Sequence, residues 1–248
     1  MEIFVDKDYA AMSRRAADML AARIIGNPTL ILGLATGSSP LGMYANLAGQ
    51  YEAGKLSFSQ VTGFALDEYR GLARRDRQSF CYYLKKNLTD ITDFPAEQLH
   101  VIDGTAEDPS RACADYENQI SAAGGVDVQI LGIGLDGHIG FNEPEDCFSA
   151  RTHCVQLTEE TIRANARFFE KTENVPREAL TMGIGTIFRA REIFLLASGA
   201  EKAEILYETV YGKVRPAVPA SILQFHPNTK LFLDEAAYKV IRAGKRRG

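Results

Sequence analysis

Apolar residues are grouped along the chain in short continuous runs, separated by longer stretches in which they recur at helical spacing. The runs are rich in Val, Ile, Leu and Phe. Because they are continuous rather than alternating, they are typical of strands buried on both faces of a sheet. Six such runs predict strands at residues 29–35, 61–67, 99–104, 126–134, 192–198 and 229–234.

Helical periodicity fills the stretches between these runs. In residues 9–25, apolar side chains share one face with Arg and Asp on the other, and Gly26 with Pro28 ends the pattern. Alternating strands and helices predict an α/β fold, with an open, mostly parallel, Rossmann-like sheet and helices on both faces. The other predicted helices span 40–52, 78–89, 108–122, 158–169, 200–211 and 235–243.

The sequence shows no internal repeat, low-complexity tract or linker, so we expect residues 1–248 to form a single domain. Residues 150–180 differ from the rest, because they are polar and lie between two predicted strands. A connection of this length is often a lid, and we expect a helical lid over a site here.

Charge and composition exclude several classes of partner. The chain has 28 Lys and Arg against 32 Asp and Glu, a net charge of −4, so no basic field indicates nucleic acid or an anionic membrane. No apolar stretch approaches the length of about 20 residues that spans a bilayer, and no secretory signal pattern is present. The four widely spaced cysteines suggest neither a disulfide framework nor a zinc knuckle. We expect a cytoplasmic protein.

Chemically reactive side chains follow four of the predicted strands. In parallel sheets, ligands bind where loops leave the carboxyl ends of the strands. We therefore expect these segments to meet at one edge of the sheet. They are "ATGSSP" (35–40), "DEYRG" (67–71), "DGHIGFNEP" (136–144) and "SGAEKAE" (198–204).

The first segment predicts a seat for an anion. Gly37 lets the backbone approach a ligand closely, and the amides of Thr36, Ser38 and Ser39 lie where a helix begins near Pro40. A plain strand-to-helix turn with a serine cap is the alternative. The segment matches neither GxGxxG nor GxxxxGK[ST], so nucleotide binding is not indicated.

Two basic residues are candidates for the same anion. Lys202 falls in the first turn of a predicted helix, where a cation is disfavoured unless an anion offsets it. Arg163 and Arg167 are four residues apart, so they share one helix face, from which Arg167 could reach a phosphate. A solvated surface is the alternative for both arginines.

The acidic pair of the second segment predicts a proton acceptor. Asp67 directly continues an apolar run and is followed by Glu68. Because neighbouring side chains of a strand point to opposite sides, we expect Asp67 to face the site and Glu68 to orient a neighbour or cap a helix. Surface charge is the alternative.

The third segment predicts an oriented acid/base group. His138 lies between Asp136 and Glu143, and a carboxylate beside an imidazole fixes its tautomer. A structural histidine is the alternative, although the flanking Gly137 and Gly140 favour exposure to a ligand. Asp-x-His also occurs in metal sites, but the sequence lacks HxH and "GNH" motifs, so no metal is expected.

Together these segments resemble the glucosamine-6-phosphate deaminases, which convert glucosamine 6-phosphate to fructose 6-phosphate and ammonia. "LDEYRGL" and "GLDGHIGFNEP" are similar to that family's signature, and "LTMGIGT" and "GAEKA" follow in family order. One departure is Ala35, where the family usually has proline. The anion seat should survive it, because the seat depends on backbone amides.

The resemblance implies a role for each candidate. Asp67 would move a proton between carbons 1 and 2 of the open-chain sugar. His138 would assist ring opening, with Asp136 and Glu143 orienting it, and no metal or organic cofactor would take part. The residues implied to hold the 6-phosphate are Thr36, Gly37, Ser38, Ser39, Arg167 and Lys202.

Large members of this family are hexamers activated by N-acetylglucosamine 6-phosphate, bound by basic residues of the strand after the third segment. Here that strand has His153, Val155 and Gln156, and Asp146 adds an acid that would repel phosphate. We therefore expect a non-allosteric, monomeric enzyme whose partner is a small sugar phosphate, without nucleic acid or membrane.

Two other functions are compatible with parts of the sequence. The 6-phosphogluconolactonases resemble this fold and share a Gly-His loop, but they continue toward Phe-Pro rather than "IGFNEP". A sugar-phosphate sensing module is the second alternative, although such a module could dispense with the acid/base groups.

Overall fold

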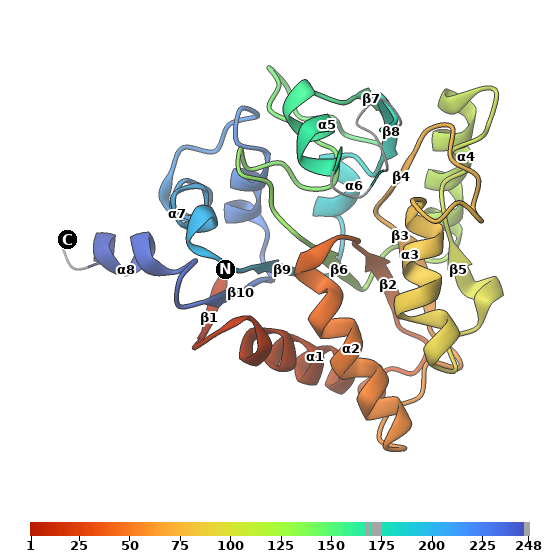
Figure 1. The fold of residues 1–248 in the computed structure, drawn as a ribbon, viewed down its shortest axis with the longest axis horizontal. Coiled ribbons are helices and arrows are strands. Elements are labelled where there is room, and N and C mark those ends of the chain that lie inside the picture. The colour runs from red at the N-terminus through yellow and green to blue at the C-terminus, as the bar shows by residue number, and fades with distance from the viewer. Residues whose placement is uncertain (167–168, 170–174, 246–248) are drawn as a thin grey trace.

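A computed structural model describes residues 1–166, 169 and 175–245. In these residues, seven strands form a parallel sheet in the order β1-β10-β9-β6-β2-β3-β5, and three form a smaller antiparallel sheet in the order β4-β8-β7 (Figure 1). The strands are β1 (Glu2–Asp6), β2 (Ile31–Leu34), β3 (Thr62–Ala65), β4 (Asp67–Tyr69), β5 (Leu99–His100), β6 (Val128–Leu131), β7 (His153–Gln156), β8 (Glu178–Thr181), β9 (Glu192–Ala197) and β10 (Thr229–Asp234).

Helices surround the parallel sheet. In the view of Figure 1, α1 and α2 lie below the sheet, and α6 and α7 lie above it. This is the predicted open α/β architecture. The helices are α1 (Tyr9–Gly26), α2 (Ser38–Glu52), α3 (Phe80–Asn87), α4 (Pro109–Ala122), α5 (Glu159–Asn165), α6 (Ile184–Phe188), α7 (Ala203–Tyr211) and α8 (Lys239–Lys245).

The six strands predicted from apolar runs all belong to the parallel sheet. Every residue of β9 and β10 is buried, which accounts for their continuous apolar pattern. Helices begin where the sequence supplies a cap: the side chains of Asp8, Ser79 and Asp108 accept backbone hydrogen bonds at the starts of α1, α3 and α4. β1 was not predicted, because this edge strand is only half-buried and its pattern is weak.

The smaller sheet was not predicted from the sequence. β7 and all but the last residue of β8 lie in the polar segment 150–180. One face of this sheet packs in a separate cluster that contains Tyr69, Phe141, Val155 and Ala179, and on the other face Leu180 packs in the main core. The predicted lid therefore contributes two strands and α5 to the fold. Residues 167–168 and 170–174 of this segment lie outside the described part of the chain.

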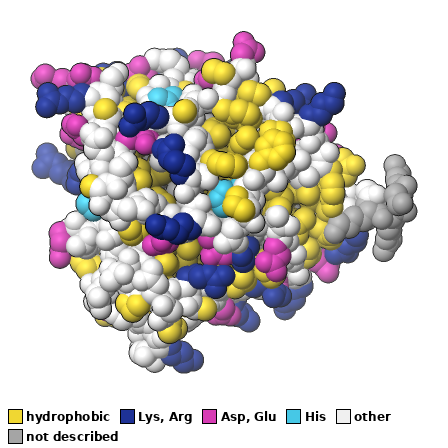
Figure 2. Space-filling view, turned by 180° about the vertical axis from the view of Figure 1, so that it is seen from behind, with side chains coloured by type: hydrophobic (Ala, Val, Ile, Leu, Met, Phe, Trp, Pro, Cys, Tyr) yellow, Lys and Arg dark blue, Asp and Glu magenta, His cyan; other side chains and the backbone are white. Residues whose placement is uncertain are grey.

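The surface carries charges of both signs. In Figure 2, basic and acidic side chains are interspersed across the face seen from behind. Within the described residues, no helix has the length and apolar character needed to cross a membrane. Cys81, Cys113, Cys147 and Cys154 are all free thiols.

Candidate active site

The four predicted segments leave four neighbouring strands of the parallel sheet. β9, β6, β2 and β3 are consecutive in the strand order, so their carboxyl ends share one edge. From β2 the chain continues outward to β3 and β5, whereas from β6 it continues to β9 and β10 on the other side. The strand order therefore reverses between β2 and β6, and ligands of open α/β sheets bind at such a switch point.

Asp67 lies at this edge as a buried carboxyl group. Asp67 is the first residue of β4, and it is 6% exposed. In the described part of the chain, its Oδ1 atom has no hydrogen-bond partner. Burial, reinforced by the charge of Glu68, raises the pKa of Asp67 to about 8. Such a group can take up or release a proton near neutral pH.

Glu68 faces a different set of partners, as the alternation of a strand predicts. Its carboxylate accepts hydrogen bonds from the backbone N–H groups of Tyr69, Phe80 and Cys81, each at 2.9 Å. Burial raises the pKa of Glu68, although these three hydrogen bonds oppose the shift. Because Phe80 and Cys81 are the first residues of α3, Glu68 caps that helix and fixes it beside Asp67.

His138 is held in a tight glycine-rich turn. The carbonyl of His138 accepts a hydrogen bond of 2.9 Å from the Gly134 amide, and Gly137 has a φ of +90°. A Cβ atom on Gly134 would lie 2.2 Å from the imidazole, so only glycine fits beneath the ring. The imidazole is 28% exposed and therefore accessible to a ligand.

Asp136 orients this imidazole. Its Oδ1 atom lies 2.7 Å from His138 Nδ1, in a contact that is bent relative to an ideal hydrogen bond, and also accepts the His138 backbone amide at 3.1 Å. Partial burial acts to raise the pKa of Asp136, but the contacts with His138 outweigh it and the pKa is lowered. Asp136 is thus an ionised partner for the imidazole.

Glu143 makes its hydrogen bonds elsewhere. Its carboxylate accepts from the Thr161 hydroxyl at 2.5 Å and from the Thr158 backbone amide at 3.3 Å. These contacts join the 134–144 loop to the start of α5. Asp136 is the acid that contacts the imidazole in this structure, and a direct role of Glu143 toward His138 stays a prediction.

The loop after β2 has the shape of an anion seat. Gly37, with a φ of +90°, is the N-cap residue of α2, and in the described part of the chain no side chain caps this helix. The predicted alternative of a serine cap is therefore wrong. The first N–H groups of α2, beginning at Ser38 and Ser39, are left for a ligand.

Lys202 and Ser39 both lie against the end of β6. Lys202 Nζ donates to the Ile133 carbonyl at 2.7 Å, and Ser39 Oγ would be 3.5 Å from a Cβ atom placed on Gly132. The cation and the start of α2 therefore border the same stretch of backbone. Arg167 lies outside the described residues, and Arg163 is exposed near the end of α5.

Thr181 links Asp67 to the 134–144 loop, and sequence reasoning missed it. In the smaller sheet Thr181 pairs directly with Asp67. Its hydroxyl accepts the Phe141 amide at 3.1 Å, and a Cβ atom on Gly140 would lie 2.7 Å from the same oxygen. No local signal could have identified Thr181, because its partners are distant in the sequence.

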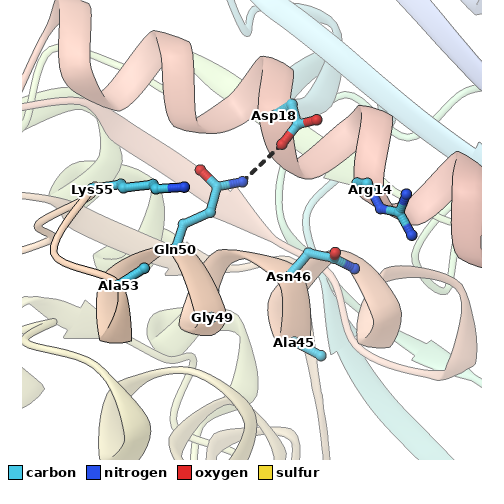
Figure 3. A pocket seen from close by; sticks show the side chains of 8 residues that line it. All are labelled: Arg14, Asp18, Ala45, Asn46, Gly49, Gln50, Ala53 and Lys55. Atoms are coloured by element: carbon cyan, nitrogen blue, oxygen red, sulfur yellow. Dashed lines mark hydrogen bonds between the residues drawn. The ribbon is translucent and has the colours of Figure 1, made fainter.

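One surface groove lies away from the predicted catalytic residues. An open groove of about 510 Å³ lies between α1 and the second half of α2, with Arg14 and Lys55 toward opposite ends (Figure 3). A 2.9 Å hydrogen bond from Gln50 to Asp18 crosses it. The described candidate residues are not among those that line this groove; their segments follow strands at the carboxyl edge of the sheet.

The chain is an α/β protein with an imidazole–carboxylate pair, His138 and Asp136, and a buried carboxyl group, Asp67, on loops and strands near the topological switch point of its sheet. Residues 6–232 match the model of the family described as glucosamine-6-phosphate isomerases/6-phosphogluconolactonase. The chain belongs to this family.

Individual relatives agree with this assignment. The chain is 52% identical to the glucosamine-6-phosphate deaminase of Clostridioides difficile, over 96% of this chain and 95% of the relative. It is 48% identical to that of Alkaliphilus oremlandii, over 97% of this chain and 100% of the relative.

Solved structures show the same fold. A monomeric glucosamine-6-phosphate deaminase superposes with a TM-score of 0.94 at 38% identity, over 97% of this chain and 100% of that one. The 6-phosphogluconolactonase of Trypanosoma brucei has a TM-score of 0.76 at 21% identity, covering 96% of this chain and 97% of that one. The second likeness concerns the fold alone.

Proposed function

We propose that the protein is an isomerising deaminase that converts glucosamine 6-phosphate and water to fructose 6-phosphate and ammonia. The observation that carries this proposal is the buried Asp67 carboxyl, with a pKa of about 8 and an unpartnered oxygen, on the same sheet edge as the Asp136–His138 pair. Hydrolysis of a lactone requires no base for a C–H proton, whereas an aldose–ketose isomerisation does. The relatives that are about half identical to this chain carry the name of the deaminase.

The proposed reaction begins with ring opening. His138, held by Asp136, moves a proton between the anomeric hydroxyl and the ring oxygen, which yields the open-chain aldehyde. Ionised Asp67 then takes the proton from carbon 2, which the neighbouring carbonyl makes acidic, and returns it to carbon 1. Over the same steps the amino group loses one proton and the oxygen of carbon 1 gains one, which gives a hydroxyl at carbon 1 and an imine at carbon 2. The imine adds water and releases ammonia, leaving the ketone of fructose 6-phosphate.

The phosphate end of the substrate is proposed to bind at the start of α2. The amides of Thr36, Gly37, Ser38 and Ser39 would hold the anion, with Lys202 beside them. Arg167 is proposed as a further phosphate ligand. Binding this remote group orients the reacting carbons toward Asp67.

We propose a monomer without allosteric activation, in line with the monomeric deaminase that superposes on this chain. Because sugar phosphates are metabolites of the cell interior, we propose a cytoplasmic enzyme.

An assay of purified protein with two substrates tests the function. Ammonia and fructose 6-phosphate should appear in equal amounts from glucosamine 6-phosphate, while 6-phosphogluconolactone should be hydrolysed no faster than in buffer. Rapid lactone hydrolysis without ammonia release would assign the lactonase activity instead. Binding of glucosamine 6-phosphate without turnover would assign a sensor.

The pH dependence of the rate should report Asp67. The carboxyl must be ionised to accept a proton, so kcat/KM should fall as the pH drops below the pKa of about 8. The decline should approach about tenfold per pH unit on the acidic side. The measurement is kcat/KM across the neutral and alkaline range, corrected for the titration of the substrate itself. A flat corrected profile through this range would contradict the assignment.

Lys202→Ala should weaken substrate binding. Loss of a charge-assisted contact to the phosphate is expected to raise KM about tenfold or more, with a smaller effect on kcat. Steady-state kinetics of this variant measure both constants. Lys55→Ala is the matched control, since Lys55 lies in the groove between α1 and α2. Equal KM values for both variants would place Lys202 outside the phosphate site.

A further inference from the structure

Three tyrosine hydroxyls donate hydrogen bonds to the carbonyl oxygens of the loop after β2. Tyr44 donates to Ala35 at 2.8 Å, Tyr83 to Gly37 at 2.6 Å, and Tyr9 to Ser38 at 2.7 Å. These tyrosines come from α2, α3 and α1 respectively, so three separate helices converge on one short loop.

Each of these hydrogen bonds fixes the direction of one backbone amide. A trans peptide group is planar, and its C=O and N–H point in opposite directions. Holding the carbonyls of Ala35, Gly37 and Ser38 therefore sets the direction of the N–H groups of the residues that follow, which are Thr36, Ser38 and Ser39. These are three of the four amides of the proposed phosphate seat.

The Tyr9 hydroxyl also enters the first turn of α2. It donates to the Ser38 carbonyl and accepts a hydrogen bond of 2.8 Å from the Gly42 amide. In an ordinary first turn of a helix, these two backbone groups pair with each other. The bridging hydroxyl of Tyr9 thus ties the start of α2 to the start of α1.

We infer that Tyr9, Tyr44 and Tyr83 are positioning residues that hold the 35–39 loop in its phosphate-binding conformation. This inference rests on the proposed function for the identity of the ligand. A carbonyl that turned toward the phosphate would repel it, and a donor bound to each carbonyl prevents that rotation. The amides then bind the anion without a reorganisation of the loop.

The surroundings of two of these tyrosines keep them as donors. Tyr44 is fully buried, and burial raises its pKa well above the usual value for tyrosine. Burial and, to a smaller extent, the nearby Tyr9 also raise the pKa of Tyr83. Both hydroxyls therefore keep their proton throughout the pH range in which the enzyme would act.

Tyr83 is also connected to the proposed base. It lies on α3, whose first amides are held by Glu68, the residue next to Asp67. The Tyr83 hydroxyl reaches across to the Gly37 carbonyl at the other end of the site. Through α3, the phosphate seat and the position of Asp67 are thus fixed to the same rigid element.

Tyr83→Phe tests the inference, with Tyr82→Phe as the matched control on the same helix. Losing one hydrogen bond to the loop should raise both the KM for glucosamine 6-phosphate and the Kd for inorganic phosphate about fivefold. The kcat should change by less than about twofold, since the reacting carbons are remote from the loop. Tyr9→Phe is a second variant, and it should likewise raise the KM and the Kd for phosphate with little change in kcat.

Isothermal titration with inorganic phosphate separates this inference from the proposed function. If the wild-type protein releases no ammonia but Tyr83→Phe still weakens phosphate binding, the function fails and the positioning role stands. Unchanged phosphate affinity in both Tyr83→Phe and Tyr9→Phe would overturn the inference. An equal loss in Tyr82→Phe would also overturn it, because the effect would then not depend on the carbonyl contacts.

Discussion

Asp67→Asn is expected to lower kcat for ammonia release by about 10³-fold, within the range found when a general base is removed. Asparagine has nearly the same shape and can occupy the same buried position at the start of β4. It cannot accept the proton from carbon 2, so isomerisation should stop after ring opening. A coupled assay of ammonia at saturating substrate measures the loss.

Stability and binding serve as controls for this variant. The pKa of Asp67 is raised from 3.8 to about 8 in the folded protein. A raised pKa means that the wild-type protein loses stability as the pH rises toward 8, because ionisation of the buried group is unfavourable. Asp67→Asn lacks this penalty, so its Tm should exceed that of the wild type above pH 8.

Phosphosugar binding should persist in Asp67→Asn. Retained turnover would remove Asp67 as the base.

His138→Gln is expected to lower kcat with glucosamine 6-phosphate about 100-fold, since an acid/base group typically contributes 10²- to 10⁴-fold. Glutamine can still form hydrogen bonds but cannot shuttle a proton to the ring oxygen. The inhibition constant of 2-amino-2-deoxyglucitol 6-phosphate should stay nearly unchanged, because this alcohol has no ring to open.

His100→Gln is the matched control for this prediction. His100 lies in β5 at the outer edge of the sheet, where it stacks on Phe64 and contacts Gln119. Its replacement should leave turnover close to that of the wild type. If inhibitor binding weakened as much as turnover in His138→Gln, the histidine would act in binding rather than in ring opening.

The parallel sheet could be predicted because buried strands carry a continuous apolar pattern that few other structures share. The smaller sheet could not. β7 and β8 are only four residues long and lie in or beside a polar stretch, and β4 follows β3 so closely that the two appear as a single run. What identifies them as strands is their pairing: β4 pairs with β8 across more than a hundred residues, and β7 pairs with β8 across the connection that holds α5. Neither pairing leaves a local pattern.

The candidate site was predictable to the extent that its geometry is local or follows from topology. Asp136 and His138 are two residues apart, and their contact is present. The convergence of four loops follows from the rule for parallel sheets. By contrast, the contacts of Glu143 with α5 and of Thr181 with the 134–144 loop join distant segments, and nothing in their sequence spacing indicates them.

The most direct test of the account is a crystal structure of the protein with 2-amino-2-deoxyglucitol 6-phosphate. We expect the phosphate on the amides of residues 36–39 beside Lys202, carbons 1 and 2 about 3–3.5 Å from the Asp67 carboxyl, and the His138 imidazole beside the oxygens of carbons 1 and 5. The inhibitor bound in the groove between α1 and α2, or with its phosphate against Asp67, would contradict it.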